Sequence, residues 1–548
     1  MEINFTPNYS GLFNDTRLEA RAINFWSQLS IRTVSVVRQL SKSPSEQKAF
    51  YRFLTNPKVS EEKLIEEATG RVKHLCDNSH VLCIQDTSEI NLINHRNRID
   101  GNSGLGRSDN SQIAYCFKLH PGLVINAETL APLGYSAIKI FNRDHDKPYR
   151  LNRNYKKQPI EDKESYKWIE IPQISKETLQ RASMVTFIED REGDIFEQFA
   201  LVPDSRTHLI IRSRTTRKLL NGEDMYESVL DSTIAGTYKI NIPSEKRTGQ
   251  NRREATIQVR FIECKIQRPR NLNKEKYPVS IPLYCISAVE EGKSSTKINW
   301  KLLTTHKIET FDQALQIIKW YSSRWNIEQV FRLLKKDGFG IEESELESGW
   351  SIRKLVIMQL TVILKILQMN LSFGDPTIGL PIKVAFDDEQ IKLLEIMNAD
   401  LEGSTEKQKN PYNKTSIKWA AWIIGRMGGW KGYVSQGIPG VITLKIGLEQ
   451  FNKLLIAVRI IKDVGYTVAV VGQALIGSST QRFILRTEPC QPCQPSQPGA
   501  LNKRLRQCPT QNPELRTQNT ELRTENFTNT MLIVPPNKMP TFKARYEE

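Results

Sequence analysis

The sequence has little cysteine or histidine. In 548 residues there are 8 cysteines and 7 histidines, both scattered along the chain. A closed structural zinc site needs four such ligands close together. The single CxxC pair, Cys490 and Cys493, has no second pair nearby. We therefore expect neither a zinc site nor a disulfide framework, and we expect a reduced, cytoplasmic protein.

Long apolar runs are also missing. The most apolar window, residues 355–369, is interrupted by Gln359 and Lys365 and is short for a bilayer span, so we expect a buried helix there. The first fifteen residues lack a basic segment followed by an apolar one, which argues against secretion. These features predict that the protein has no membrane partner.

Positive charge, in contrast, is in excess. Lysine and arginine number 77 against 61 aspartate and glutamate residues, which gives a formal net charge of +16. A strongly basic chain favours a polyanionic partner such as nucleic acid. The length exceeds what one hydrophobic core usually organises, so we expect several domains.

The composition and hydrophobic pattern of the sequence change along the chain and predict six regions. Amphipathic runs with cap-like residues before them, such as Asp15 and Ser60, indicate helices at the N-terminus. Strand-like runs follow, and Gln, Pro, Asn and Thr dominate the end. The predicted regions are helical at 1–72, the first part of an α/β core at 73–214, a β-rich insertion at 215–298, the second part of the core at 299–375, helical at 376–477, and a disordered low-complexity tail at 478–548.

Three carboxylates stand at positions suited to metal-assisted chemistry. Asp86 and Asp190 each follow a strongly apolar strand-like run, and Glu328 lies in a later helical segment. Carboxylates from two strands and one helix can hold two Mg²⁺ or Mn²⁺ ions about 3.5 to 4 Å apart for in-line phosphoryl displacement. The plainer interpretation is that an Asp after a strand serves as a turn residue or helix cap.

A polar stripe surrounds Glu328. If residues 320–340 form one helix, then Tyr321, Arg324, Glu328 and Lys335 project from one side within an arc of about 60°. The two cations and the phenol can hold phosphates by hydrogen bonds. The alternative is a solvated helix face with an ordinary i,i+4 pair of Arg324 and Glu328.

The spacing Tyr321-x2-Arg324-x3-Glu328-x6-Lys335 resembles the YREK signature of the IS-four family of bacterial insertion-sequence transposases. Collinear segments also resemble the family over about residues 12–460. These segments are FYRFLTNPKVS at 50–60, IQDTS at 84–88, DREGDI at 190–195 where the family reads DREADI, IIRSR at 210–214, and NWKLLTT at 299–305.

The resemblance implies an α/β fold with an RNase H-like core, a mixed sheet flanked by helices. It implies that Asp86, Asp190 and Glu328 are the catalytic, metal-binding triad for two Mg²⁺ ions, for which Mn²⁺ can substitute. The family cuts transposon DNA by hydrolysis, forms and reopens a hairpin, and joins the ends to a target. We accordingly expect a DDE transposase for cut-and-paste transposition, located in the bacterial cytoplasm with the nucleoid.

The resemblance also implies DNA-binding roles. The partners would be double-stranded transposon ends and target DNA, bound by a homodimer in a synaptic complex, with dimerisation through 376–477 and end recognition through 1–72. A flipped base would stack on Trp300, although a strand tryptophan can equally be plain core. The other residues implied to contact DNA are Tyr321, Arg324, Lys335, Arg212, Arg17 and Arg21.

Two other functions use the same residues. One is a catalytically silent inhibitor that binds DNA ends, and the presence of all three acids argues against it. The other is a metal-dependent nuclease without strand transfer, and the large β-rich insertion and Trp300 argue against it. An RNA-binding protein has the least support, because neither an RRM aromatic signature nor a GXXG loop is evident.

Overall fold

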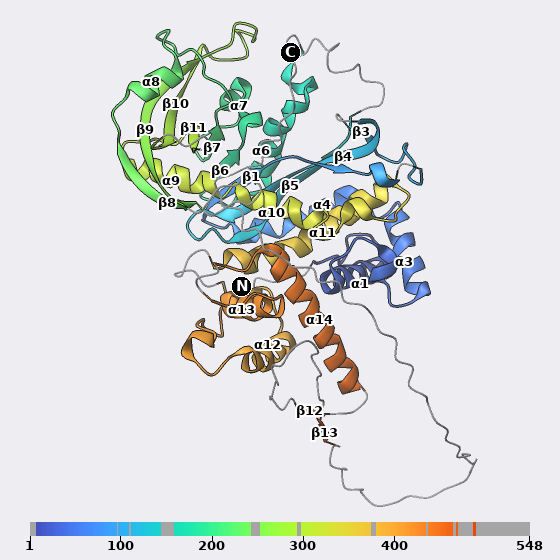
Figure 1. Ribbon diagram of the computed structural model, residues 1–548. Helices are drawn as coiled ribbons and strands as arrows, with labels where there is room; N and C mark the ends of the chain where they lie inside the picture. The colour runs from blue at the N-terminus through green and yellow to red at the C-terminus, as the bar shows by residue number, and fades with distance from the viewer. Residues whose placement is uncertain are drawn as a thin grey trace, which may run out of the picture.

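A single large mixed sheet crosses the molecule, with helices on both of its faces (Figure 1). The N-terminal and C-terminal helices lie beside each other below this sheet (Figure 1). The structure is a computed structural model. It describes residues 7–95, 97–108, 111–143, 158–242, 253–292, 297–373, 380–433, 437–463, 467–469 and 486–488.

Five strands form the centre of the sheet. They are β1 (His80–Gln85), β4 (Ser111–Asn126), β5 (Pro132–Phe141), β6 (Met184–Glu189) and β7 (Thr207–Arg212). β1 pairs parallel with β6 and β6 with β7, while β4 lies antiparallel to both β1 and β5. The order β5-β4-β1-β6-β7 is consistent with an RNase H-like core. β1 and β6 carry near-continuous apolar runs because both faces of the central sheet are covered.

The β-rich insertion continues the same sheet. Its strands are β8 (Gly236–Ile242), β9 (Arg253–Gln267) and β10 (Ser280–Glu290), and helix α8 (Met225–Asp231) packs on β9 and β10. β11 (Asn299–Thr304) joins β10 to β7, with Leu303 opposite Ile211. The insertion therefore extends the core at one edge. Two short strands, β2 (Ser88–Asn91) and β3 (Gly106–Ser108), pair with β4 at the other.

Separate apolar clusters cover the two faces of the sheet. On one face, α6 (Lys167–Thr178) and α7 (Phe196–Leu201) bury side chains with alternate residues of β1 and β6, such as Cys83 and Phe187. On the other face lie α9 (Phe311–Ser322), α10 (Trp325–Leu334) and α11 (Gly349–Leu371), packed on Ile84 and Ile188. Because side chains alternate along a strand, neighbouring residues serve opposite faces.

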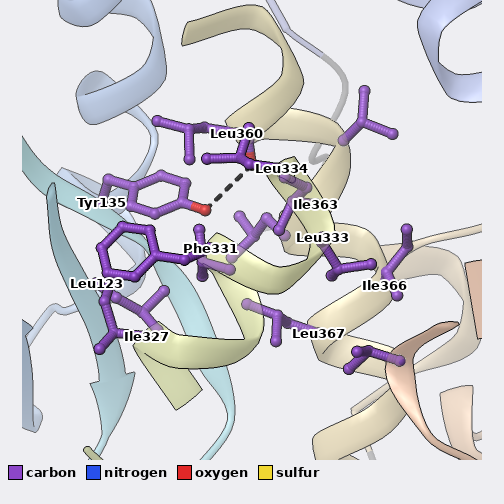
Figure 2. Packing of buried hydrophobic residues seen from close by; sticks show 14 of the residues in the cluster. Leu123, Tyr135, Ile327, Phe331, Leu333, Leu334, Leu360, Ile363, Ile366 and Leu367 are labelled. Atoms are coloured by element: carbon purple, nitrogen blue, oxygen red, sulfur yellow. Dashed lines mark hydrogen bonds between the residues drawn. The ribbon is translucent and has the colours of Figure 1, made fainter. Parts of the chain in front are cut away.

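Helix α10 is held between the sheet and α11. Figure 2 shows Ile327 and Phe331 of α10 among side chains from the sheet and from α11, including Leu123 and Leu360. The Tyr135 hydroxyl donates a hydrogen bond to the Leu360 carbonyl oxygen at 3.2 Å. Helix α10 is thereby fixed relative to the central strands, and so is any group in its first turn.

Helix α11 is the apolar segment that the sequence singled out. It is long and apolar enough to cross a membrane by length and composition alone, yet 83% of its most apolar window is buried inside the protein. Lys354, on the same helix, donates to the carbonyl oxygens of Leu54 and Asn56 at 2.9 and 3.3 Å. The segment is thus a core helix in this structure, as expected.

Helical regions flank the core at both ends of the chain. The N-terminal helices are α1 (Thr16–Arg32), α2 (Val37–Leu40), α3 (Pro44–Thr55), α4 (Glu61–Gly70) and α5 (Val72–Leu75); the C-terminal ones are α12 (Asp388–Leu401), α13 (Ile417–Met427) and α14 (Val441–Asp463). Asp15 and Ser60 cap α1 and α4 as predicted. Asn452 of α14 donates to the Ser30 carbonyl oxygen at 2.9 Å, which ties the two regions together.

The shorter elements complete the described chain. They are the 3₁₀ turns η1 (Ile93–His95), η3 (Ile160–Asp162), η4 (Glu164–Tyr166), η5 (Arg191–Gly193), η7 (Ile341–Glu343), η8 (Ile382–Val384) and η9 (Glu406–Gln408), and the paired strands β12 (Thr467–Ala469) and β13 (Arg486–Glu488). β13 falls within the segment predicted to be a disordered tail, and the rest of that segment lies outside the described residues.

Candidate active site

Two aspartates lie at the carboxyl ends of neighbouring parallel strands. Asp86 follows β1 and Asp190 follows β6, so the pairing of the two strands brings them to the same edge of the sheet. Asp86 accepts a hydrogen bond from the Thr87 backbone N–H at 2.7 Å, and Asp190 accepts one from that of Glu192 at 2.8 Å. Each aspartate is therefore a turn residue as well as a candidate ligand.

The predicted single helix over 320–340 is wrong, because it is interrupted at Ser323 and Arg324. The hydroxyl groups of Ser322 and Ser323 donate to carbonyl oxygens of the preceding turn, which weakens the regular helical hydrogen bonding. The Arg324 N–H bonds the Tyr321 carbonyl oxygen, three residues back, at 3.0 Å. Tyr321 thus belongs to α9, Glu328 to the first turn of α10, and Lys335 follows the end of α10.

Arg324 joins the strand end to the helix. Its Nη1 lies 2.6 Å from Asp86 Oδ2, and its Nη2 lies 3.0 Å from Glu328 Oε1. The Arg324 side chain is only 1% exposed, against 16% for Asp86 and 30% for Glu328. The i,i+4 pair exists, but the solvated-face interpretation is wrong for Arg324, since the guanidinium is buried between two carboxylates.

Burial and neighbouring charges raise the pKa values of the two aspartates. Burial raises the pKa of Asp86 to about 6, with Arg324 opposing and Glu328 reinforcing the shift. Burial also raises the pKa of Asp190 to about 6, and the nearby Asp86 charge adds to this. The Asp86 charge thus disfavours the ionised form of Asp190, and the Glu328 charge disfavours that of Asp86, so an added cation among these carboxylates would be favoured.

The donor set fits a divalent cation in its chemistry. Asp86, Asp190 and Glu328 supply carboxylate oxygens, which Mg²⁺ and Mn²⁺ prefer. The Arg324 guanidinium already stands as a cation between two of the three. Within the part of the chain that the structure describes, no three His, Cys, Asp or Glu side chains are arranged as a preformed metal site. The ligands would therefore have to close around an ion.

Tyr321, Trp300 and Arg212 gather beside the carboxylates. The Tyr321 hydroxyl is buried without a hydrogen-bond partner among the described residues, and burial raises the pKa of this phenol to about 12. Its ring meets Trp300 edge-on, with centroids 5.2 Å apart. Trp300 is 7% exposed and belongs to the core cluster. Burial lowers the pKa of Arg212, which faces Tyr321 and Arg324. The DNA-binding roles of these residues stay predictions.

The remaining predicted residues lie elsewhere. The Lys335 ammonium pairs with Glu342 at 3.7 Å instead of with Glu328. Arg17 and Arg21 lie on α1 in the N-terminal region, where Arg17 is exposed and pairs with Asp15 at 3.6 Å. The structure does not bring these three cations to the carboxylates, and their contacts with DNA stay predictions.

A buried polar network near the aspartates was not predicted. Gln85 and Glu189, the last residues of β1 and β6, are both buried, and Gln85 Nε2 donates to Glu189 Oε1 at 3.1 Å. Their signal in the sequence is a polar residue at the end of each apolar strand, directly before each aspartate. Such residues are also typical of turns, so the pattern alone does not indicate a buried contact.

Comparison with known proteins points to one class of enzyme for the core. Residues 141–365 match the family model described as "Transposase DDE domain", a range that includes Asp190 and Glu328 but begins after Asp86. This match supports a relationship to the DDE transposases. Among solved structures the chain is similar to the piggyBac transposase in its synaptic complex with hairpin DNA, at 9% identity over 66% of this chain and 73% of that one, with a TM-score of 0.31. A score this low does not indicate a shared fold.

Proposed function

We propose that this protein is a DNA transposase of the IS-four type, with an RNase H-like core, which moves an insertion sequence by cutting and pasting. One observation carries the proposal: Asp86 and Asp190 end adjacent parallel strands, and Arg324 ties Asp86 to Glu328. The match of residues 141–365 to a transposase DDE domain supports it independently. DDE transposases cleave and transfer DNA strands and use divalent metal ions, so we expect Asp86, Asp190 and Glu328 to be catalytic.

The three carboxylates would hold two Mg²⁺ ions, for which Mn²⁺ can substitute. Bound there, the ions would lower the pKa of an attacking water or hydroxyl and offset charge on the leaving oxygen. To admit them, Arg324 would have to release Asp86 and Glu328, and its guanidinium could then donate to a DNA phosphate. The Tyr321 hydroxyl, which has no hydrogen-bond partner among the described residues, could donate to the same phosphate. The fixed position of α10 keeps Glu328 aligned with the strand ends.

The full reaction is proposed from the family resemblance and the charge of the chain. Hydrolysis at the transposon end would be followed by hairpin formation, reopening and joining to target DNA. A homodimer would bring two ends together through residues 376–477, and the basic α1 would contact the ends through Arg17 and Arg21. Trp300 would receive a flipped base only if its contact with Tyr321 opens. The net charge of +16 favours such a DNA partner. A location in the bacterial cytoplasm is proposed from the family resemblance alone.

The test is a reaction of the purified full chain with Mn²⁺ and a duplex that contains a transposon end. We expect nicks, then hairpins, then joined products. Nicks without hairpins or joined products would support a metal-dependent nuclease. End binding without any cleavage would support a silent inhibitor. Glu177, an exposed acid on α6, offers a matched control, because Glu177→Gln changes a carboxyl far from the strand ends and should cleave like the wild type.

A further inference from the structure

The two residues just before the aspartates, Gln85 and Glu189, point away from the proposed catalytic face. Alternation along β1 and β6 directs them to the same face as Cys83 and Phe187, which is covered by α6 and α7. Both are fully buried, at 0% exposure. A buried carboxyl in an apolar layer is costly unless it is hydrogen-bonded, so Glu189 needs a structural reason to be there.

The Glu189 carboxyl connects two strands and a helix. Its Oε1 accepts from Gln85 Nε2 at 3.1 Å and from Gln198 Nε2 of α7 at 2.5 Å. Gln85 Oε1 in turn lies 3.2 Å from His120 Nε2 on β4, and His120 Nδ1 lies 2.7 Å from Thr87 Oγ1. The network therefore runs from Gln198 of α7 through side chains on β6, β1 and β4. It ends at Thr87, the residue that follows Asp86.

The other oxygen of Glu189 packs against the turn that carries Asp190. Glu189 Oε2 has no hydrogen-bond partner among the described residues. A Cβ atom added at Gly193 would lie 2.1 Å from it, far inside contact distance. Gly193 ends η5, which Asp190 caps with its side chain. The carboxyl thus fills the space that a side chain at position 193 would otherwise occupy.

We propose that Glu189 is a positioning residue that fixes the ends of β1 and β6 beside each other, so that Asp86 and Asp190 are placed to close on a divalent cation. It acts through Gln85 on the end of β1 and through Gly193 on the turn after β6. The inference rests on the proposed function, because it assumes that the two aspartates bind the metal. Residues behind metal ligands typically change metal affinity or activity by about 10- to 100-fold when they are altered.

The test measures Mn²⁺ binding to the full chain without DNA, by electron paramagnetic resonance at neutral pH. Glu189→Ala should raise the dissociation constant for Mn²⁺ by roughly tenfold or more. Glu189→Gln keeps an oxygen that can accept both amides, so it should stay within about threefold of the wild type. If Glu189→Ala binds Mn²⁺ as tightly as the wild type, or if Glu189→Gln is as weak as Glu189→Ala, the inference is wrong.

A control separates positioning from general loss of stability. Glu290 is another buried acid of the same sheet, bound by Arg253 and the Ile298 N–H far from the strand ends. Glu290→Ala should lower the thermal midpoint and leave Mn²⁺ affinity unchanged. If it weakens Mn²⁺ binding as much as Glu189→Ala does, then Glu189 acts through stability alone and the inference fails.

A second variant tests the same contact without removing the carboxyl. Gly193→Ala places a methyl group against Glu189 Oε2 and should weaken Mn²⁺ binding several-fold. In a Glu189→Ala background the carboxyl is gone and only the Cβ at position 189 lies near, at 3.0 Å, so Gly193→Ala should change the affinity much less than it does in the wild type. Equal effects of Gly193→Ala in both backgrounds would contradict the inference, and this comparison stands even if one single variant folds poorly.

A different variant, Asp190→Asn, tests the proposed function itself. If Asp190→Asn binds Mn²⁺ like the wild type, then the aspartates are not the metal ligands and the site itself is wrong. If Asp190→Asn loses Mn²⁺ binding while Glu189→Ala keeps it, the site stands and only the positioning role falls.

Discussion

The two ends of the central strands hold opposite chemistry. Carboxylates with a buried guanidinium lie at the carboxyl ends of β1 and β6. At the other end, the imidazoles of His80 and His306 each lie 2.8 Å from the Thr186 hydroxyl through Nε2. His208 stacks on His306 with ring centroids 4.1 Å apart. Three of the seven histidines therefore meet at the edge farthest from the aspartates.

Burial alone does not distinguish these two clusters. It lowers the pKa of His80 to about 4 and that of His306 to about 3, so both rings are neutral near pH 7 and bind a hydroxyl. Burial also raises the pKa of Asp86, but there Arg324 supplies a charged partner. The difference teaches that opposed charges held together beside solvent, and not desolvation by itself, mark the candidate site for a cation and DNA.

The largest expected effect comes from removing one ligand at the carboxylate end. Glu328→Gln should lower the rate of DNA cleavage by more than about a hundredfold, beyond the range for residues behind the ligands. Single-turnover cleavage of an end-containing duplex measures this. Binding of the duplex without metal should remain, and Glu177→Gln should behave as the wild type. Full cleavage by Glu328→Gln would remove Glu328 from the active site.

The next effect comes from breaking the ion pairs. Arg324→Met leaves Asp86 and Glu328 without their cation, and should lower the free energy of unfolding by about 2 kcal/mol at pH 7, a value reduced from that of fully buried pairs because Glu328 is 30% exposed. Urea denaturation without metal measures this. Added Mn²⁺ should stabilise Arg324→Met more than the wild type. Unchanged stability at pH 7 would show that the bridge is not a significant contact.

Lowering the pH should weaken metal binding by Asp86 and Asp190. Asp86 and Asp190 have pKa values raised to about 6, so the folded, metal-free protein takes up protons between about pH 6 and pH 4 more readily than the unfolded chain does. These two groups therefore favour the folded state as pH falls through that window and oppose it as pH rises. Because both ligands must be ionised, and each costs about tenfold at pH 5, the affinity for Mn²⁺ should fall roughly a hundredfold from pH 7 to pH 5. Calorimetric titration checks this, and a flat profile would contradict the assigned ligands.

The smallest effect is expected at the histidine end. His306→Phe removes one hydrogen bond to Thr186 and should cost about 1 kcal/mol of stability. Cleavage and Mn²⁺ affinity should stay within about twofold of the wild type, since the change lies at the opposite edge of the sheet. Thermal unfolding measures the loss of stability, and the cleavage assay measures the rate of cleavage. A large loss of cleavage would mean that the two ends of the strands are coupled.

The sequence was sufficient where local pattern decides structure. The apolar runs before Asp86 and Asp190 predict strands, and β1 and β6 end one residue after those runs. The i,i+4 spacing of Arg324 and Glu328 predicts their contact, which the structure contains. The apolar window at 355–369 also predicts a buried helix, and α11 (Gly349–Leu371) spans that window.

Longer-range features could not be read from pattern. Hydrophobic periodicity does not reveal that the hydroxyl groups of Ser322 and Ser323 interrupt the helix before Arg324. The pairing of β11 with β7, which merges the insertion with the core, depends on residues about ninety positions apart. Lys335 turns to Glu342 because the chain folds back in η7. Glu189 looks like an ordinary turn acid until Gln85 and Gln198 are placed beside it.

The most direct measurement is a Mn²⁺ titration of four full-length proteins, followed by electron paramagnetic resonance: the wild type, Asp86→Asn, Asp190→Asn and Glu328→Gln. The wild type should bind Mn²⁺ saturably, and each variant should bind it at least about tenfold more weakly, because each loses a charged ligand. Binding by any one variant as tight as that of the wild type would contradict the claim that Asp86, Asp190 and Glu328 form one metal-dependent site.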